Sequence, residues 1–266
     1  MIHTITVCAG TSDYRVAAQE YAKHFAAWFD ARLCVVAVIE PKDSAALSAS
    51  GEEPGRLMEA EAMRVIERIQ PAGPHAVSHF RGEGAIDGLL AEAKESDLLI
   101  LGMPTEAAAV SDPVAEAMLH DELPVLRGAE CSLLIVAEPP RKLGRALVNY
   151  QGGIEGKTAL RMAGELAERT SAGLVVLSVQ RDLSLASMLT GTAEEYLKGF
   201  DLSSVECIAD KDSPESESDI LHFAHSVRAG IIILGEEPYG FWHRFMGQAT
   251  AEEVALATRI PVLIAR

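Results

Sequence analysis

The stretch Asp97-Leu-Leu-Ile-Leu-Gly102 decides the fold, because it returns near the other end of the chain as Ala229-Gly-Ile-Ile-Ile-Leu-Gly235. In both places an unbroken apolar run stops at a glycine, and a segment with helical spacing of apolar residues precedes it, residues 85–95 and 218–227. Such runs are typical of parallel strands that are covered on both faces. The chain therefore holds the same buried strand twice, which predicts an internal repeat.

The segments upstream and downstream of these strands repeat as well. The first copy begins with the apolar run Ile5–Thr11, which ends in a glycine turn, and Asp13 is the expected N-cap of the helix that follows. The second copy, about 140 residues later, has a strand, a turn, a helix and a strand in the same order, at residues 146–150, 151–153, 156–170 and 174–179. Each copy closes on a helix and a final apolar strand, residues 131–136 and 260–264. A helix separates every pair of strands, so we predict an α/β chain of two tandem, doubly wound, five-stranded parallel-sheet domains of Rossmann-like type.

The domain boundaries follow from a proline-rich join. We place the first domain at residues 1–138, the second at 144–266 and the linker at 139–143, since Glu138-Pro139-Pro140-Arg141-Lys142 favours a short, stiff, extended connection. Each domain ends in an apolar strand, which is a sticky edge when it is left unpaired. We expect strands 133–137 and 262–265 to pair or face each other, so that the two domains form an intramolecular pseudo-dimer. A homodimer of chains stays open.

Composition and charge exclude several classes of function. The formal net charge is −16, and no cluster of Lys and Arg is present, which argues against a nucleic-acid or anionic-membrane partner. The four cysteines form no CxxC pair, which favours free thiols in a reducing compartment. The opening residues lack the basic and apolar regions of a signal peptide, and no run approaches the length of a membrane span. We expect a cytoplasmic protein that has a protein partner and binds neither nucleic acid nor membrane.

Four stretches of the sequence, at residues 7–11, 125–136, 148–153 and 235–266, resemble the universal stress protein family, whose fold is also described as adenine nucleotide alpha hydrolase-like. Val7–Thr11 and Val148–Gly153 resemble its first strand and turn, and Gly235–Arg266 resembles its glycine loop, last helix and final strand. Val125–Val136 resembles the final strand of that family in the first copy. The resemblance covers nearly the whole chain in two copies. It implies a role in the response to stress.

The resemblance also implies where a nucleotide would bind. ATP-binding members carry Gly-x2-Gly-x9-Gly-Ser/Thr after the fourth strand and an Asp after the first, because glycines let backbone amides approach phosphates. In the first copy Ala9 stands at the Asp position, and no second glycine follows Gly102. The second copy is closer, and the residues that would form its ATP or AMP site are Gln151, Gly152, Gly153, Gly235, Gly240 and Gly247. However, Pro238 replaces the second glycine, and Glu236 and Glu237 would repel phosphates.

Two other motifs compete with this reading. The run Gly152–Thr158 is one residue short of a phosphate-binding Gly-x4-Gly-Lys-Thr loop, so we expect Lys157 to face solvent. His222 and His225 lie three residues apart on a helix and could offer two ligands to a metal.

Segment 182–201 could cover the ligand site or contact a partner, and the aromatic residues 241, 242 and 245 could fill the nucleotide pocket.

No Gly-x-Ser-x-Gly elbow or Ser-His-Asp arrangement is present in the sequence. The sequence therefore predicts a non-enzymatic stress-response module, regulatory or ligand-binding, with degraded ATP loops, no catalytic residues and no dedicated metal site. One alternative is a switch that binds ATP or AMP through the second domain, with slow ATPase activity. The other is a metal or small-ligand sensor that uses His222 and His225.

Overall fold

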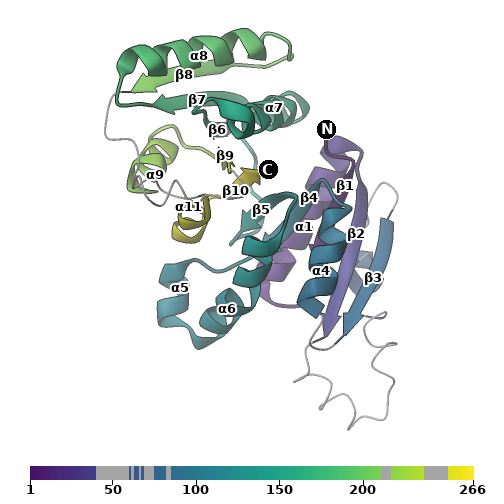
Figure 1. The fold of residues 1–266 in the computed structure, drawn as a ribbon. Helices are drawn as coiled ribbons and strands as arrows, with labels where there is room; N and C mark the ends of the chain where they lie inside the picture. Colours follow the sequence, from purple (N-terminus) through teal and green to yellow (C-terminus); the bar gives the residue numbers. More distant parts are fainter. Residues whose placement is uncertain are drawn as a thin grey trace, which may run out of the picture. The chain divides into compact units, whose positions relative to one another are not determined.

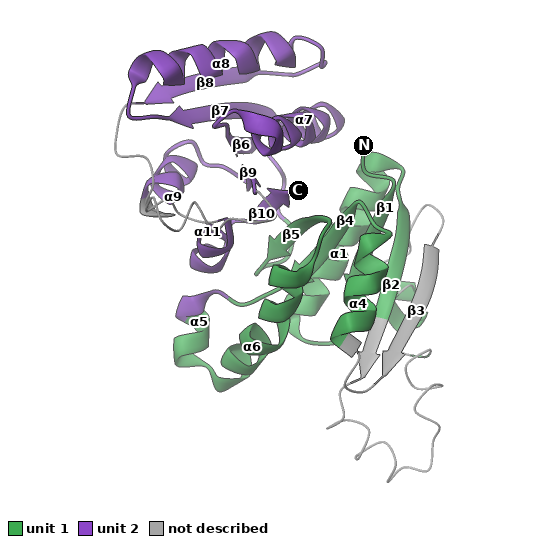
Figure 2. Ribbon diagram, in the orientation of Figure 1, with its two compact units in different colours: residues 1–104, 108–140 green, residues 105–107, 141–266 purple. Residues whose placement is uncertain are grey.

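The computed structural model describes residues 1–39, 60, 63–65, 67–68, 75–81, 85–210, 217–236 and 251–266; for residues 37–39, 75–81, 85 and 217–218 it describes the backbone alone. The chain divides into two compact units, residues 1–104 with 108–140 and residues 105–107 with 141–266 (Figure 2). We call the repeat in unit 1 the first copy and the repeat in unit 2 the second copy.

Unit 1 alternates strands and helices (Figure 1). Its elements are β1 (Thr4–Cys8), α1 (Asp13–Phe29), β2 (Arg32–Ile39), β3 (His75–Arg81), α4 (Ala85–Lys94), β4 (Leu98–Gly102), α5 (Glu106–Ser111), α6 (Pro113–Gly128) and β5 (Ser132–Val136). The strand order is β3-β2-β1-β4-β5, and every pair of neighbours is parallel.

Unit 2 has the same plan (Figure 1). Its elements are β6 (Arg145–Asn149), α7 (Gly153–Thr170), β7 (Gly173–Val179), α8 (Leu183–Leu197), β8 (Val205–Asp210), α9 (Glu217–Ser226), β9 (Ile231–Gly235), α11 (Ala251–Ala257) and β10 (Val262–Ala265). The strand order β8-β7-β6-β9-β10 matches that of unit 1, again with parallel neighbours. The predicted tandem of doubly wound five-stranded parallel sheets is confirmed.

The core of each unit is aliphatic. In β4 every residue is buried, and Ile5, Leu33 and Leu99 have no exposed surface. The helices pack small residues against the sheet; α7, for example, buries Ala159, Ala163 and Ala167 completely. Burial of one large aliphatic side chain stabilises the fold by about 1.5–3 kcal/mol, so these strands supply most of the core, to which α1 adds the buried rings of Phe25 and Phe29.

The helix starts differ from the sequence-based prediction. Ser12, not Asp13, is the N-cap of α1: its backbone is extended and its side chain accepts a hydrogen bond from the Arg15 amide, while Asp13 is already helical. Helix α7 begins at Gly153 rather than at residue 156, because Gly152 and Gly153 adopt positive φ angles of 80° and 72° and turn the chain directly into the helix. Glycine adopts such angles at no steric cost, which favours it at both positions.

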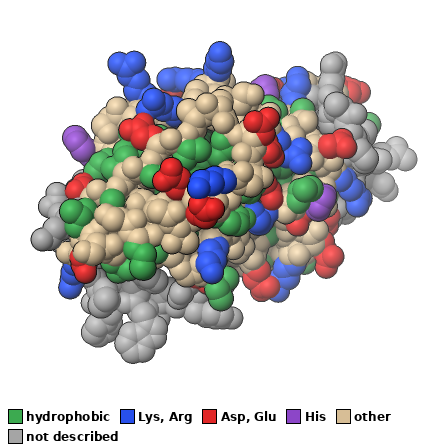
Figure 3. All heavy atoms as spheres, turned by 90° about the horizontal axis from the view of Figure 1, so that it is seen from above, with side chains coloured by type: hydrophobic (Ala, Val, Ile, Leu, Met, Phe, Trp, Pro, Cys, Tyr) green, Lys and Arg blue, Asp and Glu red, His purple; other side chains and the backbone are tan. Residues whose placement is uncertain are grey.

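Within the described residues, no helix is long and apolar enough to cross a membrane. Acidic and basic side chains are interspersed on the face shown in Figure 3.

Candidate functional site

Each sheet has a switch point, where a doubly wound fold binds its ligands. The chain leaves β1 toward β2 but leaves β4 toward β5, so the switch point of unit 1 lies between β1 and β4, and that of unit 2 between β6 and β9. Ligands of such sheets bind beyond the carboxyl ends of the strands at this place. Four of the predicted residues, Gln151, Gly152, Gly153 and Gly235, lie there; Gly240 and Gly247 are outside the described residues, as are the aromatic residues 241, 242 and 245.

A glycine at the end of the fourth strand lets a helix approach the switch point in both copies. A Cβ on Gly235 would lie 2.6 Å from the carbonyl oxygen of Glu155, in the first turn of α7. A Cβ on Gly102 would likewise strike the backbone of Tyr14 and Arg15, in the first turn of α1. The first helix of each copy therefore begins directly over the end of the fourth strand.

These contacts and the strand registers fix which residues correspond. In the first copy the backbone N–H of Ala9 donates a hydrogen bond to the carbonyl oxygen of Val36. In the second copy the N–H of Tyr150 donates in the same way to the carbonyl oxygen of Leu177. Gly10, not Ala9 as the sequence suggested, therefore corresponds to Gln151. The contacts of Gly102 and Gly235 in turn match Arg15 with Gly156.

The ends of the last helices and strands give a further match. Gly102 pairs with Val136 as Gly235 pairs with Ala265, and α6 and α11 end at the same distance before these strands, at Gly128 and Ala257. Counting back from these ends, Glu122 of α6 corresponds to Ala251 of α11. Both positions are buried.

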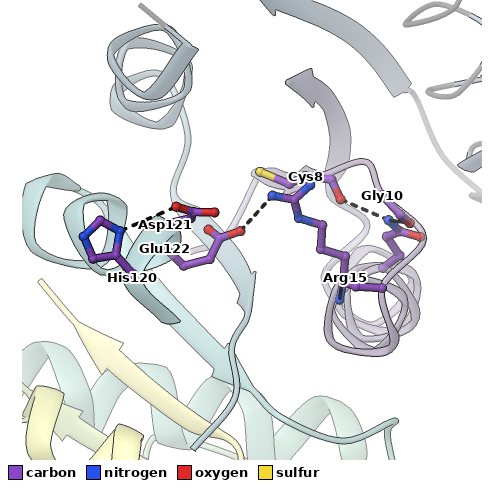
Figure 4. A network of polar contacts seen from close by, with 8 residues as sticks. Cys8, Gly10, Arg15, His120, Asp121 and Glu122 are labelled. Atoms are coloured by element: carbon purple, nitrogen blue, oxygen red, sulfur yellow. Dashed lines mark hydrogen bonds and ion pairs between the residues drawn. The ribbon is translucent and has the colours of Figure 1, made fainter. Parts of the chain in front are cut away.

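An ion pair spans the switch point of the first copy. The Arg15 guanidinium Nη2 lies 3.2 Å from Oε1 of Glu122, whose side chain is 6% exposed (Figure 4). Right-handed crossovers place α1 on one face of the sheet and α6 on the other, so this pair joins the two helix layers. In the second copy Gly156 and Ala251 stand at these positions, and neither can form such a bridge.

The turn of the first copy is held by further polar contacts. The buried side chain of Gln19 donates from Nε2 to the carbonyl oxygens of Cys8, at 3.0 Å, and Gly10, at 3.1 Å. Its Oε1 accepts a hydrogen bond from Arg68. The side chain of Arg15 folds over Gly10 so closely that a Cβ there would overlap its Cδ. The first copy thus covers its own turn with side chains.

The pKa of the Cys8 thiol depends on burial and on the charges at the switch point of the first copy. Burial chiefly, and the Glu122 carboxylate in addition, raise the pKa of its thiol to about 12, although the Arg15 guanidinium acts in the opposite direction. Cys8 therefore stays a neutral thiol near an ion pair and is unsuited to act as a nucleophile.

The second copy leaves its first helix without a side-chain cap. Gly152 is the N-cap of α7 and offers no side chain, whereas Ser12 caps α1. The first N–H groups of a helix have no acceptor within the helix itself, and the positive end of the helix dipole favours an anion. Leu189 of α8 lies over this turn, since a Cβ on Gly152 would be 3.1 Å from its Cδ2.

Glu236, predicted to repel phosphates, is neutralised by the last residue of the chain. Nη2 of Arg266 lies 2.8 Å from Oε2 of Glu236, and the two side chains are only 9% and 23% exposed. The carboxylate next to Gly235 therefore has a cationic partner, which weakens the sequence-based argument against an anion here.

The structure also places the two other motifs of the sequence, the run Gly152–Thr158 and the pair His222 and His225. Lys157 is exposed, as expected, and the neighbouring Ile154 is 78% exposed. His225 is engaged with its own helix, because its Nδ1 lies 2.6 Å from the Leu221 carbonyl oxygen. Among the residues that the structure describes, no group of three His, Cys, Asp or Glu side chains could hold a metal ion.

Segment 182–201 is mostly the helix α8. It packs on β7 and β8 and buries Ala186, Ala193 and Leu197. Its other side leaves Leu185, Met188 and Tyr196 40%, 59% and 46% exposed. The helix thus contacts the turn at Gly152 and also carries exposed apolar side chains.

Comparisons with known proteins agree with this architecture. The universal stress protein family matches residues 1–137. No curated protein matches the chain. Among solved structures, a universal stress protein from Archaeoglobus fulgidus DSM 4304 is 17% identical with a TM-score of 0.71, over 99% of this chain and 96% of that one.

Two further structures share the fold. A functionally unknown protein from Pseudomonas aeruginosa PAO1 is 17% identical, with a TM-score of 0.65 over 99% of this chain and 92% of that one. The cytoplasmic domain of a prokaryotic cation chloride cotransporter is 10% identical, with a TM-score of 0.51 over 100% of this chain and 95% of that one. At these identities the likeness concerns the fold alone. The family match covers more than half of the chain, and with the repeated architecture it shows that the protein belongs to the universal stress protein family, in a tandem form.

Proposed function

We propose that the chain is a non-enzymatic regulatory module whose second copy binds an adenine nucleotide, while the first copy has become structural. The observation that carries this is the exchange of Arg15 and Glu122 for Gly156 and Ala251 at matching positions. Where the first copy joins its helix layers by an ion pair, the second copy has only small residues. Small residues at a switch point allow a ligand to approach the backbone.

The turn of the second copy supports an anionic group. Gly152 and Gly153 have positive φ angles, and α7 starts there without a side-chain cap. A phosphate at this place would accept hydrogen bonds from the first amides of α7 and meet the positive end of an 18-residue helix. The ion pair of Glu236 with Arg266 removes one uncompensated negative charge from the neighbouring strand end.

The absence of catalysis is part of the proposal. Cys8 is held neutral, with a pKa of about 12, and among the described residues no metal cluster is present. A bound nucleotide would therefore act by changing the conformation or partner affinity of the chain, as a switch does.

Calorimetric titration of the whole chain with ATP and with AMP, with and without Mg²⁺, tests this proposal. We expect one equivalent of nucleotide per chain. Gly153→Asp should weaken binding about tenfold or more, because its carboxylate would occupy the helix N-terminus and repel phosphate. The matched variant Gly153→Asn has the same shape, tolerates positive φ and is neutral, so it should bind nearly as the unaltered chain does. No binding by the unaltered chain, or equal binding by both variants, would contradict the proposal.

A second candidate function is self-association through α8. Leu185, Met188 and Tyr196 recur at spacings that place them along one side of the helix. An antiparallel pair of α8 helices from two chains would cover these apolar side chains. Sedimentation equilibrium should then show a dimer that Met188→Glu converts to monomer; a monomer at all concentrations excludes this candidate.

A further inference from the structure

Asn149 carries a buried polar atom that no group in the described part of the chain satisfies. It is the last residue of β6, and its Oδ1 is buried and has no hydrogen-bond partner among the described residues. An amide oxygen left in this state costs about 1–3 kcal/mol, and native proteins keep few such atoms. A retained orphan at the carboxyl end of a strand points to a group that arrives from outside.

The register places Asn149 at the switch point of unit 2. It is aligned with Leu177 of β7 on one side and with Leu234 of β9 on the other. The next residue, Tyr150, faces α7, because a Cβ on Gly156 would lie 3.4 Å from its ring. Since side chains alternate along extended backbone, Asn149 points to the opposite face of the sheet, where right-handed crossovers place α9 and α11.

The first copy shows what fills the corresponding place. Cys8 is the counterpart of Asn149, and it lies within the electrostatic reach of Glu122 and Arg15 (Figure 4). The second copy has Ala251 and Gly156 instead of that pair, together with an amide instead of a thiol. The exchange of all three residues replaces an ion pair and a thiol by two small residues and a carboxamide, whose Oδ1 has no hydrogen-bond partner among the described residues.

We propose that Asn149 reads the base edge of the ligand in the second copy. A carboxamide has one acceptor and two donors, and whichever way it is turned, its complement is an edge that presents a donor beside an acceptor. The 6-amino group and ring nitrogen of an adenine have this pattern, whereas a phosphate offers acceptors alone. Asn149 is therefore a specificity-determining residue, and the helix N-terminus at Gly153 takes the anionic end of the same ligand. This inference rests on the proposed nucleotide site.

The test compares AMP with purine riboside 5′-monophosphate, which keeps the ring nitrogens as acceptors but lacks the 6-amino donor. By calorimetry, the unaltered chain should bind AMP about tenfold or more tightly than purine riboside 5′-monophosphate, because the latter leaves Oδ1 without its donor. Asn149→Cys, which installs the residue of the first copy, should bind the two nucleotides equally. Cys8→Ala in the first copy is the matched control and should keep the preference for AMP.

The outcomes separate the two proposals. If the unaltered chain binds neither nucleotide, both the nucleotide site and the role of Asn149 are wrong. If it binds AMP and purine riboside 5′-monophosphate equally, or if Asn149→Cys keeps the preference, the role of Asn149 is wrong while the nucleotide site stands. The comparison of the two ligands on the unaltered chain decides the matter even if the variant does not fold.

Discussion

Gly235 and Glu155 lie in backbone contact: the end of β9 approaches the first turn of α7 so closely that a Cβ on Gly235 would lie 2.6 Å from the Glu155 carbonyl oxygen. The same relationship holds between Gly102 and Tyr14 in the first copy. The terminal glycine of the fourth strand is therefore a packing requirement that both copies retain, whether or not a ligand binds nearby.

Gly235→Ala should destabilise unit 2 by about 3 kcal/mol, because neither the strand nor the helix backbone can move aside cheaply. Urea unfolding followed by circular dichroism measures this. Gly144→Ala is the matched control, since no atom lies within 4 Å of its Cβ. If both variants unfold at the same urea concentration, the close approach is not as described. For the same reason, a substitution at Gly235 would be a poor test of ligand binding.

Gly191→Ala should stabilise the protein by about 0.5–1 kcal/mol. Gly191 lies inside α8 with open space around its Cβ, so alanine removes backbone entropy from the unfolded chain without a clash. Gly164→Ala in α7 is the contrasting variant, because its Cβ would lie 3.1 Å from the Phe200 ring. Thermal unfolding should rank Gly191→Ala above the unaltered chain and Gly164→Ala below Gly191→Ala; the reverse ranking would refute this account of the two helices.

Arg15→Ala should destabilise unit 1 by about 2–4 kcal/mol, because it leaves the Glu122 carboxylate buried without its cation. Adding Glu122→Ala should recover part of that loss, which a double-mutant cycle in urea measures. Lys94 and Glu130 form an exposed pair at 2.8 Å, and their removal should leave the unfolding midpoint unchanged. If removal of either ion pair lowered the free energy of unfolding by the same amount, the Arg15–Glu122 bridge would contribute no more to stability than an exposed pair.

Stability should fall above pH 9 through Cys8. Its folded pKa of about 12 exceeds the ordinary value of 9.0, so the unfolded chain loses this proton first and is stabilised relative to the folded chain as pH rises from 9 to 12. The contribution is complete below pH 9 and declines by about 1.4 kcal/mol per pH unit above it. Urea midpoints at pH 8.5 and 10.5 should differ more for the unaltered chain than for Cys8→Ala. An identical pH dependence in both proteins would mean that Cys8 is not buried.

The sequence predicted the architecture because every signal for it is local. The glycine-ended runs at 97–102 and 229–235 and the helical spacing before them fix the order of elements, and right-handed crossovers then leave one sheet topology. The detail of the helix starts was less accessible: Ser12 and Asp13 are both good caps, and only the backbone shows that Ser12 has the extended conformation.

The contents of the switch points could not be predicted in the same way. Arg15 and Glu122 are more than a hundred residues apart, and each alone resembles a surface residue of an amphipathic helix. Gln19 likewise shows its role only when its amide is found on the carbonyl oxygens of Cys8 and Gly10. Asn149 is one polar residue at the end of an apolar strand, and whether its Oδ1 finds a partner depends on neighbours from other strands and helices. The sequence signal for these residues is the difference between the two copies at matching positions, which can be read only once the copies are correctly aligned.

The central claim is that the two copies have diverged, one closed by an ion pair and one left for a ligand. It is tested most directly by counting AMP sites by calorimetry in the unaltered chain and in Gly156→Arg/Ala251→Glu, which transfers the pair of the first copy to the second. We predict one site per chain in the unaltered protein and none in the double variant, with both proteins folded by circular dichroism. Two sites in the unaltered chain, or an undiminished site in the double variant, would contradict the account.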